Sequence, residues 1–187
     1  MRSDAVHKKY NVITVPGLFG SDESHWQTHW ERRFGYSRTE LGHWDNPEPE
    51  AWGRVLHECV EHSPLPVILA AHSLGSVLSV RYLECFSANV AGAFLVAPTD
   101  VEADHIPEAA KRFAPIPRTR LPVPTLVVAT ESDPYLPLAK SRELCCDWGA
   151  SLYILESGGH LGRDAALGQW DAGHELLTTF VAGLSRW

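Results

Sequence analysis

The chain has 187 residues, of which 44% are hydrophobic and 21% charged, the balance of a soluble globular protein, and its length predicts a single domain over residues 1–187. A net charge of −7 and a pI near 5.8 argue against nucleic acid or an anionic membrane as partner, and no apolar run approaches the roughly 20 residues of a membrane span. The N-terminus shows no apolar signal-peptide core, and the four cysteines show no Cys-x-x-Cys spacing. We therefore expect a cytoplasmic protein with buried free thiols.

The first expected strand, Asn11–Val15, ends in a loop that contains proline and glycine, Pro16–Gly20. A helix capped by Ser21 or Asp22 should follow, because aromatic residues recur there at i, i+4 and i+8 and predict a core-facing stripe of Trp26, Trp30 and Phe34. His25 and His29 have the i, i+4 spacing of a metal pair. No third ligand accompanies them, so we expect capping or surface histidines and no metal.

The next segments lead to the turn around which the chain is organised. A short strand at Ser37–Leu41 and a loop at Gly42–Pro47 precede a helix over residues 48–62. The apolar run Val67–Ala71 predicts a strand buried on both faces, and Ser73 follows it. The helical pattern after Ser73 places one set of side chains on the same face: Leu74, Val77, Leu78, Tyr82 and Cys85. A strand, a serine at an abrupt turn and a helix, with small Ala71 and Gly75 on either side, are typical of a nucleophile elbow. The motif alone also fits an ordinary loop in which Ser73 is a helix N-cap.

The second half of the chain continues the alternation of strands and helices. The strand Gly92–Val96 is followed by a looser segment, Thr99–Pro122, with a short helix around Pro107–Phe113. The remaining expected elements are the strands Pro124–Thr130 and Ser151–Leu155, the helix Leu138–Trp148, and a last helix that begins between Ala165 and Asp171. This order predicts an α/β protein: a three-layer α/β/α sandwich with about six mostly parallel strands.

Three side chains with complementary chemistry follow the C-terminal ends of strands, where functional groups collect in a parallel sheet. Ser73 follows the third strand, Asp133 the fifth and His160 the sixth. Their chain order, Ser, Asp, His, is that of the α/β-hydrolases. Asp100 also follows a strand and remains an alternative acid, as does Glu131.

Each of these residue types has a defined task in acyl transfer. Ser73 would attack a carbonyl carbon, His160 would take its proton, and Asp133 would fix the tautomer of the imidazole. The backbone N–H groups of Leu18 and Leu74 would bind the oxyanion. Gly17 would let the backbone approach the substrate, and Phe19 and Trp44 would form the walls of a small pocket. His72 should point away from Ser73 and have a structural role.

Several motifs resemble one known family over nearly the whole chain: VPGLFGSDESHWQTHWE, WDNPEPEAW, AHSLG, ESDPYLP and GGHLG. They are similar to those of the small serine hydrolases typified by retinoblastoma-binding protein nine and its bacterial relatives. The resemblance implies a reduced α/β-hydrolase fold without a large cap domain, a triad at Ser73, Asp133 and His160, and no metal or cofactor. The retinoblastoma protein recognises Leu-x-Cys-x-Glu, whereas residues 83–87 read LECFS, so this partner is not expected.

Two functions follow from these observations. The first is a serine hydrolase that cleaves carboxylic esters, with small amides or peptides as a second class, through an acyl-enzyme on Ser73. Only Thr99–Pro122 is available to cover the site, so we expect a small substrate. The second is a binding protein on a hydrolase scaffold whose triad is vestigial. The sequence leaves the natural substrate, the protein partner and the oligomeric state open.

Overall fold

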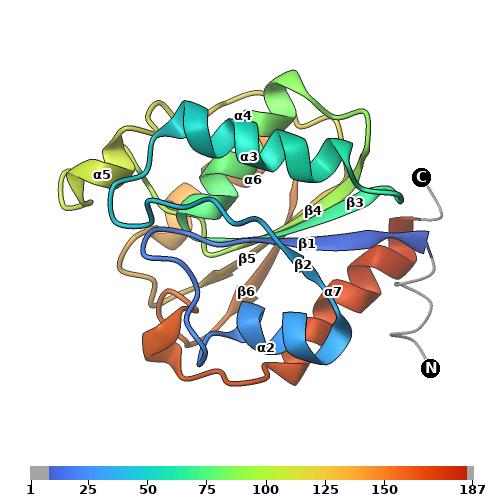
Figure 1. Cartoon of the computed structure of the whole chain (residues 1–187). Coiled ribbons are helices and arrows are strands. Elements are labelled where there is room, and N and C mark those ends of the chain that lie inside the picture. Colours follow the sequence, from blue (N-terminus) through green and yellow to red (C-terminus); the bar gives the residue numbers. More distant parts are fainter. Residues whose placement is uncertain (1–8, 185–187) are drawn as a thin grey trace.

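A six-stranded parallel sheet forms the centre of the computed structural model, which describes residues 9–184 (Figure 1). The strand order is β2-β1-β3-β4-β5-β6, and every neighbouring pair is parallel. In chain order the strands are β1 (Asn11–Val15), β2 (Ser37–Arg38), β3 (Val67–His72), β4 (Val90–Val96), β5 (Thr125–Thr130) and β6 (Ser151–Leu155). The expectation that the N-terminus has no signal-peptide core concerns residues 1–8, which lie outside the described residues.

Helices cover both faces of the sheet. One face carries α3 (Pro49–Glu61), α4 (Leu74–Cys85) and α6 (Leu138–Trp148), and the other carries α2 (Trp26–Phe34) and α7 (Asp171–Leu184) (Figure 1). Only the short helix α5 (Glu108–Lys111) interrupts the connection from β4 to β5, and a 3-10 turn, η1 (Arg163–Ala165), precedes α7. The predicted α/β/α sandwich is therefore confirmed as a reduced α/β-hydrolase fold, and residues 9–184 contain no large cap domain. None of the helices in these residues is long and apolar enough to cross a membrane.

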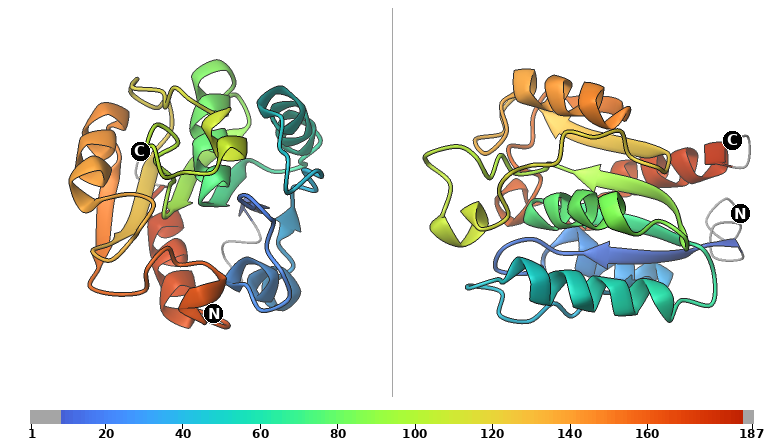
Figure 2. Two further views of the ribbon diagram at one scale, coloured as in Figure 1. Left: turned by 90° about the vertical axis from the view of Figure 1, so that its left-hand side faces the viewer. Right: turned by 90° about the horizontal axis from the view of Figure 1, so that it is seen from above.

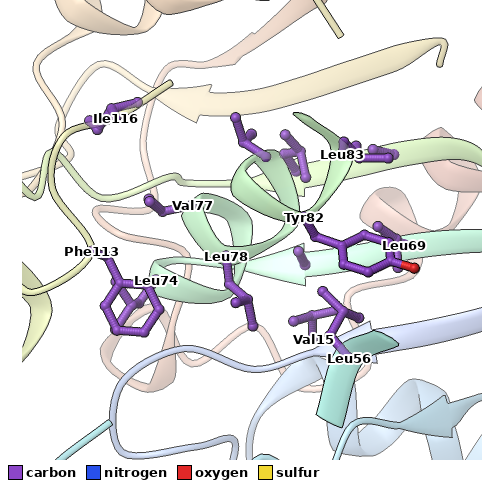
Figure 3. Packing of buried hydrophobic residues seen from close by; sticks show 14 of the residues in the cluster. Val15, Leu56, Leu69, Leu74, Val77, Leu78, Tyr82, Leu83, Phe113 and Ile116 are labelled. Carbon is purple, nitrogen blue, oxygen red and sulfur yellow. The ribbon is translucent and has the colours of Figure 1, made fainter. Parts of the chain in front are cut away.

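Two hydrophobic clusters hold the layers together. The larger lies between the sheet and the helices α3, α4 and α6, and Figure 3 shows α4 side chains such as Leu74, Leu78 and Tyr82 among residues from the sheet and neighbouring segments. The smaller joins the sheet to α2 and α7 and contains Trp26 and Trp30, each at most 1% exposed. Burial of a large apolar side chain stabilises a fold by about 1.5–3 kcal/mol, so these rows of residues fix both helix layers on the sheet.

Some details of the expected elements were wrong. The second strand ends at Arg38 rather than Leu41, because the chain leaves the sheet edge after Thr39 and Leu41 turns into the larger core cluster. The first helix is capped by His25, since the Asp22 carboxylate accepts hydrogen bonds from Ser24 instead.

The expectation of buried thiols holds for one cysteine in full. All four cysteines are free, but Cys145 alone is buried and Cys59 is half-buried. Cys85 and Cys146 are exposed. Cys85 is the last residue of α4, so it lies beyond the part of that helix which the sheet and its neighbours cover.

The order of the strands determines where a site can form. From β1 the chain moves outward to β2, and it then returns past β1 to β3 and continues in the opposite direction. The loops after β1 and β3 therefore diverge, which leaves a crevice at the C-terminal ends of these neighbouring strands. The loops that follow the strands, together with α5, lie on the side seen face-on in Figure 2 (left).

Candidate active site

Ser73 lies at the sharp turn between β3 and α4, in a strained backbone conformation. Its φ of 56° and ψ of −125° are rarely adopted by a residue with a side chain, at a cost on the order of 1–3 kcal/mol. Two glycines make room for this turn. A Cβ on Gly75 would overlap the carbonyl oxygens of Val15 and Pro16, and a Cβ on Gly17 would lie 2.8 Å from the Ser73 Cβ. The loop after β1 is thus packed directly against the serine turn.

The structure brings together the three side chains that the sequence singled out. His160 Nε2 lies 2.7 Å from Ser73 Oγ, and His160 Nδ1 lies 3.0 Å from each carboxylate oxygen of Asp133. Of the two alternative acids, Asp100 uses a carboxylate oxygen to accept a hydrogen bond from the Glu102 N–H in its own turn, and Glu131 is exposed. Among the described residues, neither is hydrogen-bonded or ion-paired to His160, so the hydrogen-bonded chain runs from Asp133 through His160 to Ser73.

The Asp133 carboxylate is held in place from two directions. Its side chain is 1% exposed, and one oxygen also accepts a hydrogen bond of 2.8 Å from the backbone N–H of Tyr135. The Tyr135 ring then packs edge-on against the His160 imidazole, with 4.7 Å between ring centroids. A carboxylate fixed in this way can accept the His160 Nδ1–H without rotating away.

Three buried side chains hold the loop that carries His160. They donate hydrogen bonds to three consecutive backbone carbonyls: Thr130 Oγ1 to Gly159 at 2.5 Å, His72 Nε2 to His160 at 2.9 Å, and Trp26 Nε1 to Leu161 at 3.0 Å. The loop itself needs φ values of 124° at Gly158 and 54° at Gly159. The expected structural role of His72 thus has a physical basis, because its ring supports the backbone of His160.

A row of imidazoles runs from α2 to the site. Ring centroids are 4.8 Å apart between His25 and His72 and 5.2 Å apart between His72 and His160. Burial holds the pKa of His72 well below its ordinary value of 6.5 and lowers that of His25 to about 4. His25 Nδ1 accepts the Gln27 N–H as the cap of α2, while its buried Nε2 has no partner among the described residues. Both rings are therefore neutral near pH 7.

The two predicted oxyanion donors belong to two segments that meet at the serine turn, since a Cβ on Gly17 would lie 3.1 Å from the Leu74 nitrogen. The Leu74 N–H belongs to the first turn of α4, where backbone N–H groups have no intrahelical acceptor. Across the described part of the chain, the Leu18 N–H also has no acceptor, whereas the next N–H along, that of Phe19, donates to the Trp44 carbonyl at 2.8 Å. The N-terminal end of α4 adds its partial positive charge at the same place.

A cavity of about 690 Å³ opens beside Ser73. Its apolar wall includes Leu18, Phe19, Ile106, Pro107 and Ala110, the last three from the segment that carries α5. Its lining also includes polar and charged residues: Asp22, His25, Arg163 and Asp164.

Of the predicted substrate-binding residues, Phe19 lines this cavity, and the other two lie outside its lining. Phe19 is 64% exposed and has a φ of 66°. The Trp44 indole packs on Gly20 and edge-on against Trp52, with 5.7 Å between ring centroids. Gly17 instead provides the close approach to the Ser73 turn. Trp44 therefore supports the loop after β1 rather than forming the wall of the cavity.

Sequence reasoning missed one residue at the centre of the site. Thr99 Oγ1 lies 2.9 Å from Ser73 Oγ, and Thr99 lines the cavity. The sequence offered one indication of this role: Thr99 follows the end of β4, at the same edge of the sheet as the other site residues.

The histidine pair on α2 does not assemble a metal site. His25 uses Nδ1 as a helix cap, and within residues 9–184 no cluster of three or more His, Cys, Asp or Glu side chains could hold a metal ion.

Comparison with known proteins extends these observations. Residues 12–179 match a family model described as serine hydrolase. A solved YdeN-like hydrolase from Pectobacterium atrosepticum is 29% identical with a TM-score of 0.88, and the alignment covers 98% of this chain and 96% of the other. A search of curated proteins gave no match.

More distant structures share the fold. The ydeN gene product of B. subtilis is 22% identical with a TM-score of 0.76, over 93% of this chain and 99% of the other. A serine hydrolase involved in carbazole degradation, the CarC enzyme, is 14% identical with a TM-score of 0.69, over 93% of this chain and 91% of the other.

Proposed function

Because the chain belongs to the serine hydrolase family, in the group of small members typified by retinoblastoma-binding protein nine, we propose that it cleaves carboxylic esters through an acyl-enzyme on Ser73. The observation that carries this proposal is the unbroken hydrogen-bonded chain from Asp133 through His160 to Ser73, with spacings of 3.0 and 2.7 Å. Small amides are a second substrate class for the same chemistry.

Each step of the proposed reaction is assigned to one group of the site. His160 takes the Ser73 proton through Nε2 as Ser73 Oγ attacks the ester carbonyl. Asp133 accepts the Nδ1–H, which keeps the second nitrogen free as a base and stabilises the imidazolium. The imidazolium then protonates the alcohol that leaves, and an acyl group remains on Ser73. A water molecule activated by His160 releases the acid in a second cycle.

The backbone N–H groups of Leu18 and Leu74 bind the negative oxygen of the tetrahedral intermediate. This role rests on their freedom from other acceptors within residues 9–184 and on the packing of Gly17 against Ser73. One such donor contributes roughly 10²- to 10³-fold to kcat in a comparable hydrolase.

The cavity supports a substrate with a short acyl group. The connection from β4 to β5 contributes only Ile106, Pro107 and Ala110 on the apolar side, and α5 is four residues long. Each buried CH₂ contributes about 0.8 kcal/mol, so the affinity for the substrate should grow with the length of its acyl chain only until the apolar part of the cavity is full. The protein is proposed to act in the cytoplasm, without metal or cofactor.

A fluorophosphonate probe tests the proposal. The purified protein should be labelled at Ser73 and nowhere else, and Ser73→Ala should lose labelling and ester hydrolysis while its melting temperature stays close to that of the wild type. An unlabelled wild type without ester hydrolysis would favour a binding protein with a vestigial triad. Labelling that persists in Ser73→Ala would place the nucleophile elsewhere.

A further inference from the structure

The Thr99 hydroxyl contacts the reacting oxygen directly. Its Oγ1 lies 2.9 Å from Ser73 Oγ, close to the 2.7 Å that separates Ser73 Oγ from His160 Nε2. Ser73 Oγ therefore has two partners, an imidazole nitrogen and a second hydroxyl. The role of the second partner is not explained by the Ser-Asp-His arrangement.

Counting protons gives the direction of both hydrogen bonds. The Asp133 carboxylate accepts from His160 Nδ1, so the neutral imidazole has an unprotonated Nε2. Ser73 must donate its single proton to this nitrogen in the competent state. The remaining hydrogen bond can only run from Thr99 Oγ1–H to Ser73 Oγ.

The Thr99 side chain has no evident task in the fold. The residue is 6% exposed, and among the described residues its hydroxyl has Ser73 as its only hydrogen-bond partner. Its position is set by the backbone instead. The next N–H, that of Asp100, donates to the Tyr135 carbonyl at 2.9 Å, and the Tyr135 N–H donates to Asp133. The segment that carries Thr99 is thus tied to the segment that carries the acid.

We propose that Thr99 is a catalytic residue of the serine hydrolase reaction, whose hydroxyl stabilises the Ser73 oxygen as it leaves during hydrolysis of the acyl-enzyme. This inference rests on the proposed function. In that step His160 Nε2 takes a proton from water as the water oxygen bonds to the acyl carbon. The bond from this carbon to Ser73 Oγ then breaks, its electron pair goes to Oγ, and the imidazolium returns the proton to Oγ. The products are a carboxylic acid and free Ser73.

The contribution of Thr99 should differ between the two halves of the reaction. In the acyl-enzyme, Ser73 Oγ is an ester oxygen and a weak acceptor, and it gains negative charge only as the bond breaks. The hydrogen bond from Thr99 therefore strengthens between ground state and transition state, which is what accelerates a step. In the first half, Ser73 Oγ already accepts this hydrogen bond as a hydroxyl before it attacks, so the gain is smaller.

Carbamylation separates the two halves experimentally. With p-nitrophenyl dimethylcarbamate, release of p-nitrophenolate reports transfer of the carbamoyl group to Ser73, and intact mass confirms the adduct. After excess reagent is removed, recovery of esterase activity reports its hydrolysis. Thr99→Val keeps the shape of the side chain and removes the donor, so the first rate should stay within about 2-fold and the second should fall roughly 3- to 10-fold, as expected for one hydrogen bond. Thr99→Ser restores the donor and should restore the second rate.

Two further variants keep the test decisive. Thr99→Ala should show the same selective loss if Thr99→Val does not fold. Thr178→Val removes another buried threonine hydroxyl, which donates to the Glu175 carbonyl in α7, and should change neither rate. An equal loss in both steps, a loss in the first step alone, or no change would overturn the role of Thr99. A wild type that is not carbamylated at Ser73 and hydrolyses no ester would overturn the proposed function, and this inference with it.

Discussion

Acidification should destabilise this fold through His25 well before general acid unfolding. The ring is 4% exposed, caps α2 through Nδ1 and has no partner for its buried Nε2 among the described residues. Burial lowers its pKa from 6.5 to about 4. In the unfolded chain the His25 imidazole takes up its proton around pH 6.5, whereas in the folded protein it does so only around pH 4.

The sign and size of the effect follow from this difference. Between these pH values the unfolded state binds more protons, so the free energy of unfolding falls as the pH falls from 6.5 towards 4. A difference of 2.5 in pKa, at 1.36 kcal/mol per unit, corresponds to about 3 kcal/mol from this one ring. His72 should add to the loss in the same direction, because burial also lowers its pKa.

Denaturant unfolding at a series of pH values from 7 to 4 measures the effect. His25→Asn keeps a side-chain oxygen that can accept the Gln27 N–H at the helix cap and removes the titrating group, so its loss of stability should be smaller than that of the wild type by up to about 3 kcal/mol. His29→Asn, on the same helix at a half-exposed position, should follow the wild type. A His25→Asn variant that loses as much stability as the wild type would refute the reasoning.

Three further outcomes are expected. Asp133→Asn should lower kcat by on the order of 10⁴-fold, as in a comparable triad. Asp100→Asn keeps an oxygen for the Glu102 N–H and should change kcat little. The opposite ranking of the two variants would identify Asp100 as the acid. For p-nitrophenyl esters, kcat/KM should peak at short acyl chains, and Ile106→Ala should move the peak to longer chains; a rise through long chains in the wild type would refute the proposed size of the acyl pocket. EDTA should leave activity unchanged, and loss of activity that a divalent metal restores would contradict the metal-independent reaction.

The regular elements were predictable because local signals bound them. Pro16 and Gly17 end β1, Pro137 precedes α6 and Gly149 caps it with a φ of 65°, and the predicted bounds of β1, α6 and β6 match the structure. The second strand was predicted too long because it lies at the edge of the sheet, where within residues 9–184 it pairs with β1 alone and pairing stops at Arg38. A sequence pattern does not reveal how far such pairing extends.

The candidate site was predictable where chemistry and strand order coincide, as for Ser73, Asp133 and His160. The supporting contacts could not be predicted, because they join segments far apart in the sequence. His72 and the His160 carbonyl are separated by 88 residues, and Ser73 and Thr99 by 26. The Trp44 indole was expected in the pocket wall, but the open backbone of Gly20 offers it a packing surface inside the loop. Local patterns do not distinguish these two positions for an aromatic ring in a loop.

The strain at Ser73 has a structural counterpart in the glycines around it. A residue with φ of 56° persists only where its surroundings leave no relaxed alternative, and here the carbonyls of Val15 and Pro16 lie against Gly75 while Gly17 lies against Ser73. A side chain at either glycine would force α4 and the loop after β1 apart. That movement would also separate the Leu74 N–H from the Leu18 N–H, because one belongs to α4 and the other to the loop. The same close packing therefore enforces the conformation of the nucleophile and sets the distance between the two donors that would bind the oxyanion.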